Sequence, residues 1–378
     1  MLDIIFLGGE DVSARIDIVE VLNQKECNVT ILGSEDRTIF DSHQISYKNI
    51  HINRELNILD DIKTIFEIRR VLKKTKNTTI VHAFDTKLII YLPFAALGLR
   101  NIKTVRTING MGRIFSGDSF KNKILQGIYI FIQKLIKNRV DYTIFQNTDN
   151  YKFFEKRNMV NRASCKVVRG SGINLKKFQS SISEKEELAK TLDINMRIPT
   201  IILVSRLIRQ KGVLEYLEAA KLINEKNQEA NFLLVGQIDT NQDAISINEI
   251  ENYSPYVNYL GRRNDIRALL SICDIFVLPS YYSEGVPRVL LEAAAMKLAL
   301  LTTDMPGCND VVVDGFNGKI INIKDTLDLV NKLRLVMSDK DELQTMKINS
   351  SIHVQQFSLD NVASEYFNIY KDLINKQL

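Results

Sequence analysis

Short runs of apolar, often β-branched residues alternate along this chain with longer segments of helical periodicity, and the alternation starts afresh once. In the first half the expected strands are 3–8, 28–33, 79–84, 103–108 and 141–146. In the second half they are 199–205, 231–236, 257–261, 274–280 and 298–303. Continuous apolar strands separated by helices indicate parallel sheets with helices on both faces. The sequence therefore predicts an α/β protein with two Rossmann-like, doubly wound domains.

The two arrays set the expected domain boundaries. A chain of 378 residues has room for two domains, and the polar segment 176–197 is the natural linker. We expect an N-terminal domain over 1–177, a second domain over 178–355, and a C-terminal helix over 356–378 that packs back on the first domain. Parallel sheets bind ligands at the carboxyl ends of their strands. Functional residues are therefore expected there, with the two domains facing each other across a cleft.

Composition and cysteine spacing exclude several other classes. The chain is 45% hydrophobic and 25% charged, which is typical of a globular protein. Its four cysteines are far apart and form no Cys-x-x-Cys pair, so neither a zinc site nor a disulfide framework is expected. The N-terminal apolar run is short and lacks a basic flank, so we expect a first strand there and no signal peptide. No apolar stretch is long enough to cross a bilayer.

Charge is distributed unevenly between the halves. Residues 1–178 carry 29 basic and 18 acidic side chains, a net charge of +11, whereas residues 179–378 carry 21 and 27, a net charge of −6. A basic half suggests contact with a polyanion or an anionic membrane. Within it, 120–139 combines a broad apolar stripe with flanking lysines, as interfacial helices do. Such a helix could equally be a core helix with a charged outer face.

The most informative stretch is LPSYYSEGVPRVLLEAAAMK at 278–297. A strand ends, a short loop carries Glu284, and a helix begins near Pro287. The backbone N–H groups of Gly285 and Val286 and the positive end of the helix suit a phosphate. Glu292 follows Glu284 by two helical turns, so two carboxylates are placed to hold two hydroxylated parts of one ligand. Alternatively, Glu284 is a solvated loop acid and Glu292 forms an ion pair with Arg288.

Two basic residues follow the first strand of the second array, in LVSRLIRQKG at 203–212. Arg206 leaves the strand and Lys211 lies just before the next helix. Two fixed cations suit a diphosphate leaving group, whose negative charge grows as a glycosidic bond breaks. The alternative is a pair of solvated surface charges.

Together, SRL…KG, LPSYYSEGVPRVLLEA and TTDMPGCNDVVVDGFNG closely resemble glycosyltransferase family 4, whose members are retaining enzymes of the GT-B fold. The resemblance implies that Glu284 contacts the donor sugar, Glu292 the nucleotide ribose, and Arg206 with Lys211 the diphosphate. It also implies that Pro306 and Gly307 lie near the donor sugar. Asn309–Asp310 stand where Arg-Glu is common, which leaves the donor specificity open.

Candidate residues of the first domain follow its strands. Gly8–Gly9 follows the first strand and matches the loop that the family places near the reaction centre, so the resemblance implies that Gly8 and Gly9 contribute to donor binding. Asn109, in RTINGMGRIF at 106–115, begins a loop expected to border the acceptor, and His82 ends another strand. His82 is interpreted either as an acceptor-side residue or as a structural histidine. TINGMGRIF, IFQNTDN and VVRGSGIN resemble the subgroup that extends lipid-diphosphate-linked saccharides for bacterial surface glycans such as O-antigen and capsule.

The resemblance implies a retaining transferase that moves an N-acetylhexosamine or a hexose from a UDP-sugar to a lipid-diphosphate-linked saccharide. Because the cations are built in, we expect no metal ion or other cofactor. We also expect no nucleic-acid partner, and a cytoplasmic protein peripherally bound at the inner face of the cytoplasmic membrane. Two alternatives remain. One is a nucleotide-sugar epimerase of the same architecture, and the other is a non-catalytic subunit that binds a sugar nucleotide.

Overall fold

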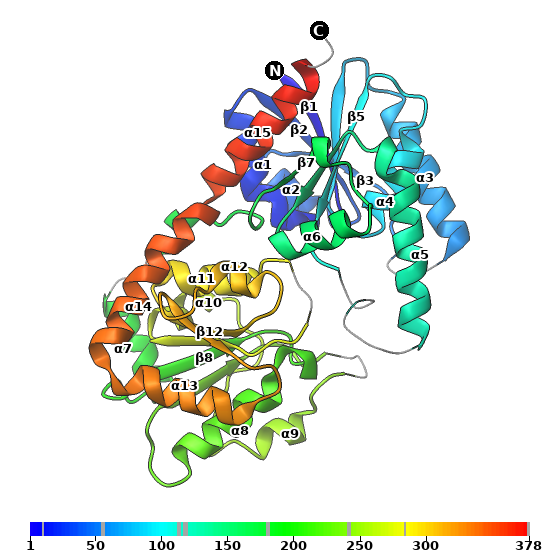
Figure 1. Cartoon of the computed structure of the whole chain (residues 1–378). Helices are drawn as coiled ribbons and strands as arrows, with labels where there is room; N and C mark the ends of the chain where they lie inside the picture. Colours follow the sequence, from blue (N-terminus) through cyan, green and yellow to red (C-terminus); the bar gives the residue numbers. More distant parts are fainter. Residues whose placement is uncertain are drawn as a thin grey trace. The chain divides into compact units, whose positions relative to one another are not determined.

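A computed structural model describes residues 1–9, 11–53, 57–111, 115, 120–178, 182–239, 243–282 and 285–375. The chain forms two compact units (Figure 1). Unit 1 comprises Met1–Gly172 and Leu359–Leu378, and unit 2 comprises Ile173–Ser358. These boundaries lie within a few residues of the expected ones. The segment 176–197, however, is no free linker, because its helix α7 (Ile182–Thr191) packs on unit 2 through the buried Ala189.

In the described residues, unit 1 contains a parallel sheet of seven strands in the order β3-β2-β1-β4-β5-β6-β7. The strands are β1 (Leu2–Leu7), β2 (Cys27–Gly33), β3 (Ser46–Asn49), β4 (Thr79–Ala83), β5 (Ile102–Ile108), β6 (Tyr142–Phe145) and β7 (Cys165–Val167). The sequence predicts all of them except β3 and β7, which are short edge strands. The predicted doubly wound fold is confirmed here.

Alternate side chains of each strand in unit 1 enter two different hydrophobic cores. Ile4 and Phe6 of β1 pack with one set of helices, and Ile5 and Leu7 pack with the other. The first set is α1 (Ile16–Gln24) and α15 (Leu359–Asn375), which lie side by side in Figure 1. The second set is α3 (Ile58–Leu72), α4 (Leu88–Ala95), α5 (Phe120–Ile136) and α6 (Thr148–Lys156). A further short helix is α2 (Thr38–Asp41). Helix α15 thus completes unit 1 although it comes last in the chain.

A buried arginine fastens α5 to the sheet of unit 1. Arg106 of β5 is 1% exposed, and burial lowers its pKa to about 10. It donates to Thr143 Oγ1 at 3.0 Å, to Gln133 of α5, and to the Met159 carbonyl at 3.2 Å. A buried charge is tolerated only when such partners replace its hydration, so these bonds fix which face of α5 points inward.

Unit 2 repeats the topology. Its described residues contain a parallel sheet of six strands in the order β10-β9-β8-β11-β12-β13. The strands are β8 (Thr200–Val204), β9 (Asn231–Val235), β10 (Asn258–Tyr259), β11 (Ile275–Leu278), β12 (Ala299–Thr303) and β13 (Gly318–Ile321). Of these, the sequence analysis did not predict β13.

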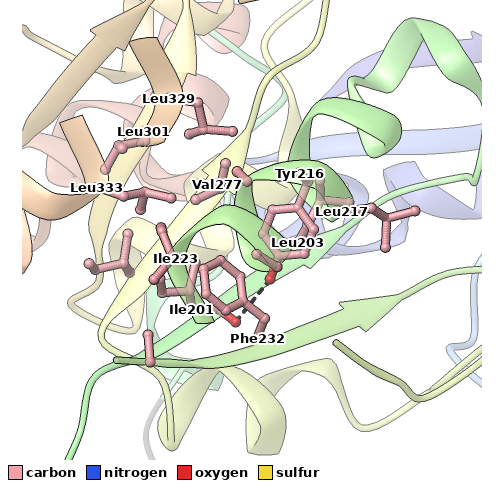
Figure 2. Close-up of a cluster of buried hydrophobic side chains, with 14 of the residues drawn as sticks. Ile201, Leu203, Tyr216, Leu217, Ile223, Phe232, Val277, Leu301, Leu329 and Leu333 are labelled. Atoms are coloured by element: carbon pink, nitrogen blue, oxygen red, sulfur yellow. Dashed lines mark hydrogen bonds between the residues drawn. The ribbon is translucent and has the colours of Figure 1, made fainter. Parts of the chain in front are cut away.

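Helices cover both faces of this second sheet. Figure 2 shows the core on one face, where Tyr216 and Leu217 of α8 (Val213–Asn224) pack with Leu329 and Leu333 of α13 (Thr326–Ser338). The other face carries α7, α10 (Ile266–Ser271), α11 (Arg288–Ala295) and α12 (Cys308–Val311). The remaining helices are α9 (Ile247–Glu251) and α14 (Lys340–His353). Cys27, Cys165, Cys273 and Cys308 are free.

Candidate functional site

The strand order of unit 2 changes direction beside its first strand. β8 pairs with β9 on one side and with β11 on the other. The helices that follow β8 and β11, α8 and α11, therefore lie on opposite faces of the sheet. Ligands of open parallel sheets bind at this switch point, beyond the carboxyl ends of the strands. The segments 205–212 and 279–287, which contain most of the predicted donor-binding residues, both follow these two strands.

Those two loops lie directly against each other. Gly212 has φ 72°, and a Cβ atom at this position would lie 2.2 Å from the Pro279 carbonyl oxygen. The Tyr281 N–H donates to the Gln210 carbonyl at 2.9 Å. Glycine is therefore required at 212 both for the left-handed backbone and for the close approach. The tertiary structure thus brings Lys211 next to the loop that leads toward Glu284.

The two predicted cations of unit 2 differ in their surroundings. Lys211 is only 8% exposed, and its Nζ lies 5.4 Å from the centre of the Tyr282 ring. The side chain of Arg206 is 49% exposed and forms an ion pair with Asp239 at 3.2 Å. A cation held out of water interacts with an anion more strongly than an exposed one. Lys211 is therefore the more deeply buried of the two, and Arg206 is held in place by its ion pair with Asp239.

A third loop, after β12, closes against the same region. Gly307 has φ 82°, and a Cβ atom there would lie 1.5 Å from the Gly285 carbonyl oxygen. Thr303 Oγ1 donates to the Ser280 carbonyl, which ties the end of β12 to the loop after β11. Pro306 and Gly307 therefore lie beside Gly285 and the buried Val286. The structure brings these predicted donor-binding residues together.

Of the two predicted carboxylates, Glu284 and Glu292, the structure describes only Glu292. Ser283 and Glu284 lie outside the described residues, so the position of Glu284 stays a prediction. Glu292 lies in α11, which follows Pro287, and its side chain is 17% exposed. Burial raises the pKa of Glu292, and the Arg288 guanidinium at 3.1 Å opposes this rise. The ion pair with Arg288, which was the alternative interpretation of Glu292, is thus present. A carboxylate has about four acceptor positions, so this ion pair leaves Glu292 able to accept further hydrogen bonds.

The sheet of unit 1 has its own switch point, between β1 and β4. Gly8 and Gly9 follow β1, and a Cβ atom at Gly8 would lie 2.6 Å from Val12 Cγ2. The Gly9 N–H donates to the Asp85 carboxylate, which follows β4. Asn109, after β5, donates through Nδ2 to the Phe84 carbonyl at 2.9 Å. The predicted Gly8, Gly9 and Asn109 thus gather at one edge of the sheet.

Asp85 was not identified by the sequence analysis. It stands three residues after His82 in a loop without a recognised motif, and its partner Gly9 is 76 residues away. The strand order 2-1-4 alone brings the two together. The only available signal was its position directly after a predicted strand.

The acceptor-side interpretation of His82 is wrong. The side chain is 0% exposed and lies among the rings of Phe6, Phe84 and Tyr366. Its Nδ1 is 2.6 Å from the Tyr370 hydroxyl and its Nε2 is 2.6 Å from Thr107 Oγ1. Burial holds its pKa well below the usual value. His82 is a structural residue that joins α15 to the sheet, because a helix from the far end of the chain covers it.

No group of three or more side chains suited to a metal ion occurs among the described residues. The chain contains one Asp-x-Asp spacing, Asp339–Lys340–Asp341. Asp339 precedes α14 and accepts hydrogen bonds from the N–H groups of Asp341 and Glu342 at 3.0 and 2.9 Å. This spacing is therefore a helix cap.

Comparison with known proteins supports the family resemblance. Residues 184–352 match the family model "Glycosyl transferases group 1". The chain is 30% identical over 369 residues to N,N'-diacetylbacillosaminyl-diphospho-undecaprenol alpha-1,3-N-acetylgalactosaminyltransferase of Campylobacter jejuni, which covers 95% of each chain. It is 27% identical to UDP-Gal:alpha-D-GlcNAc-diphosphoundecaprenol alpha-1,3-galactosyltransferase of Escherichia coli, over 85% of this chain and 83% of that one.

Solved structures show the same fold. HepE of Anabaena in complex with UDP superimposes with a TM-score of 0.81 at 16% identity, covering 98% of this chain and 100% of that one. A glycosyltransferase from Rickettsia africae superimposes with a TM-score of 0.78 at 20% identity, covering 99% of each chain. The family model matches the second half of the chain, and a glycosyltransferase related at 30% identity aligns over 95% of it. This protein therefore belongs to the glycosyl transferases group 1 family and is a glycosyltransferase of the GT-B fold.

Proposed function

We propose that this enzyme transfers an N-acetylhexosamine or a hexose from a UDP-sugar to an undecaprenyl-diphosphate-linked saccharide during synthesis of a bacterial surface polysaccharide. The observation that carries the proposal is the buried Lys211 at the switch point of unit 2, beside the loops of Gly285 and Gly307. The Campylobacter and Escherichia coli relatives are named for undecaprenyl-linked acceptors, and HepE was solved with UDP.

Unit 2 holds the donor in this proposal. Lys211 and Arg206 bind the diphosphate together with the N–H groups of Gly285 and Val286, whose loop leads into the positive end of α11. Glu292 accepts hydrogen bonds from the ribose hydroxyls, and Glu284 accepts them from the sugar. Pro306 and Gly307 border the sugar because they lie against Gly285.

Transfer proceeds with retention in this proposal. The acceptor hydroxyl oxygen forms a bond to the anomeric carbon on the face from which the diphosphate departs. The bond from that carbon to the phosphate oxygen breaks, and the hydroxyl proton passes to the released diphosphate. Lys211 and Arg206 stabilise the charge that develops on the leaving group, so no metal ion takes part. The two relatives form α linkages, which accords with retention from α-linked donors.

The test is incubation of the purified protein with a panel of UDP-sugars and a short-chain lipid-diphosphate saccharide, with chelator added. We expect one donor to extend the acceptor by one sugar and to release UDP. An isomerised UDP-sugar formed without acceptor identifies the protein as an epimerase. UDP-sugar binding with neither reaction identifies a non-catalytic binding protein, and both results contradict the proposal.

We propose also that α5 docks unit 1 on an anionic membrane surface. One face of α5 exposes an apolar stripe that includes Phe131, 66% exposed, and the helix contains no acidic residue. The other exposed members of the stripe are Phe120, Ile124, Ile128 and Leu135. Lys123 and Lys134 lie at its edge, as expected for an interfacial helix. Among the described residues, no helix has the length and apolarity needed to span a bilayer.

Co-sedimentation with vesicles of anionic phospholipid at low salt tests this docking. The double substitution Ile124→Glu and Phe131→Glu should reduce the bound fraction at least about tenfold, because each removes roughly 2 kcal/mol of apolar burial and adds a repelled charge. Leu327→Glu, at an exposed position of α13 in unit 2, is the matched control. Equal loss in the control, or no binding by the unaltered protein, contradicts the proposal.

A further inference from the structure

Helix α3 exposes a row of large apolar side chains on the outside of unit 1. Ile58, Ile62 and Phe66 are 77%, 45% and 66% exposed, and their spacing of four residues places them on one side of the helix. Leu59, 71% exposed, borders this row. The opposite side of α3 enters the hydrophobic core through Ile68. These four exposed residues, the α3 stripe, therefore point away from the sheet.

The α3 stripe shares its layer with the exposed stripe of α5. Helix α4 contacts both α3 and α5, and all three helices bury their inner sides in the same hydrophobic core (Figure 1). The α5 stripe consists of Phe120, Ile124, Ile128, Phe131 and Leu135. Helix α4, which touches both neighbours, contains no charged residue. Since packed helices lie about 8–10 Å apart, the two stripes face outward from one layer no more than roughly 20 Å from each other.

Both stripes reach the carboxyl edge of the sheet. All strands of unit 1 are parallel, so α3 and α5 begin at the carboxyl ends of β3 and β5 and return toward the amino ends of β4 and β6. The α3 stripe occupies 58–66, the half of α3 nearer that edge, and the α5 stripe begins with the first residue of α5. The same edge carries Gly8 and Asn109, for which the sequence predicts positions near the reaction centre and the acceptor. The apolar surface therefore reaches the edge where the proposed transfer takes place.

The charges around the two stripes suit an anionic partner. Residues 58–76 hold six basic and three acidic side chains, a net charge of +3, and residues 120–139 hold five basic and no acidic ones, a net charge of +5. Arg70 follows Phe66 by four residues and continues the line of the α3 stripe. Arg70 and Lys73 are exposed, and neither forms an ion pair with a residue that the structure describes. An anionic surface would therefore meet exposed basic side chains and an apolar row on one side of α3.

We propose that α3 and α5 form one surface that docks on an anionic lipid bilayer, with the α3 stripe at the level of the acyl chains and Arg70 and Lys73 against the headgroups. This inference rests on the proposed function, because it extends the docking of α5 and takes the acceptor to be lipid-linked. Two apolar rows on one layer fix the tilt of unit 1 on the bilayer, whereas a single helix can roll about its axis. The bilayer then lies beside the carboxyl edge of the sheet, where a saccharide on a membrane-anchored diphosphate can reach it.

A second copy of the chain is the alternative occupant of this surface. In a symmetric dimer the same patch meets itself, so the net positive charges of α3 and α5 would be brought together. Like charges placed against each other in an interface are unfavourable. Anionic headgroups instead attract these basic residues. The charges therefore favour the bilayer over a second copy.

The experiment is co-sedimentation of the full-length protein with phosphatidylglycerol vesicles at low salt. The α3 variant, Ile62→Glu combined with Phe66→Glu, should reduce the bound fraction at least about tenfold, because two buried apolar groups are lost and two repelled charges are added. Both positions are exposed, so the substitutions leave the core of unit 1 intact. The matched control is Leu327→Glu combined with Leu335→Glu, at exposed positions of α13 in unit 2, and it should bind like wild type.

The basic residues are tested separately with Arg70→Gln combined with Lys73→Gln. Each basic side chain near an anionic bilayer strengthens binding by about fivefold. Binding to phosphatidylglycerol vesicles should therefore fall about 10- to 30-fold, and binding to phosphatidylcholine vesicles should change less than about twofold. An equal change on both kinds of vesicle contradicts the electrostatic part of the inference.

Sugar transfer supplies a second readout that also shows whether the α3 variant is folded. The KM for an acceptor embedded in vesicles should rise at least about tenfold, in proportion to the lost vesicle binding. The KM for a short-chain acceptor free in solution should stay within about twofold of wild type, because no bilayer takes part. An equal rise for both acceptors contradicts the inference.

Three further results overturn the inference: vesicle binding by the α3 variant within about twofold of wild type, an equal loss in the α13 control, or a wild-type dimer that the α3 substitutions dissociate while vesicle binding is retained. Failure of α5 docking gives a different result, because Ile124→Glu combined with Phe131→Glu then binds vesicles like wild type while the α3 variant does not. Absence of vesicle binding by wild type contradicts both docking proposals. If wild type transfers no sugar, the vesicle assay still tests α3.

Discussion

The two units share a strand order but differ in what their switch points offer a ligand. In unit 2 a lysine that is 8% exposed lies beside loops packed through Gly212 and Gly307. In unit 1 the Gly9 N–H donates to the Asp85 carboxylate, and Asn109 Oδ1 accepts no hydrogen bond from the residues that the structure describes. One topology therefore presents different side chains at its two switch points, a buried lysine in unit 2 and polar acceptor groups in unit 1. The backbone fixes where a ligand binds, and the loop side chains decide which ligand it is.

Lys211→Ala should give the largest effect and is the most direct way to break this comparison. Removing a preorganised cation from a developing diphosphate should lower kcat by about 100- to 1000-fold. The measurement is steady-state transfer, with Lys226→Ala, an exposed lysine of unit 2, as the control. Turnover near that of wild type would remove Lys211 from the donor site.

Gly307→Ala tests whether loop packing builds the anion site. Its methyl group would overlap the Gly285 carbonyl, so unfolding free energy should fall by at least about 2 kcal/mol, and UDP binding should weaken. Gly315→Ala is a matched control, because Gly315 has φ 73° but no atom within 4 Å of its Cβ position. Equal effects of the two substitutions would show that backbone strain alone matters at Gly307.

Glu292→Gln tests whether the ionised carboxylate of Glu292 binds the ribose of the donor. We expect roughly tenfold weaker UDP binding, because a charged acceptor for the ribose is lost. Burial raises the pKa of Glu292 above its usual range, so UDP binding by wild type should weaken as the pH falls through this raised pKa, and binding by the variant should not. The ionised side chain costs stability at neutral pH, and this cost should diminish as the pH falls. Calorimetry across pH checks the first trend, and identical pH profiles would contradict it.

His82 should have the smallest effect, a change in the pH dependence of stability that involves unit 1. Its pKa in the folded protein lies below the unfolded value, so its contribution is fully present above about pH 6.5 and is lost as the pH falls. The loss is at most about 1.4 kcal/mol per pH unit. Thermal unfolding of wild type should therefore weaken below pH 6.5 more than that of His82→Phe, with the exposed His51→Gln as control. Parallel pH curves for wild type and His82→Phe would argue against this account.

Local sequence determined the elements of the fold and the identity of the family. The apolar runs predicted the central strands to within one or two residues, because such runs depend only on neighbours in the chain. The motifs around Lys211 and Glu292 indicated the family for the same reason, since their residues are close in sequence. Edge strands such as β13 were missed because they are short.

Only the tertiary structure decided which polar groups meet. Arg206 and Lys211 are equivalent in sequence, but the packing of Gly212 on Pro279 buries Lys211 while Arg206 is paired with Asp239. His82 became structural because α15, about 290 residues later, covers it, and Asp85 meets Gly9 across 76 residues. Such contacts depend on strand order and on the path of distant segments. A local pattern of side chains therefore predicts neither the strand order nor the path of distant segments.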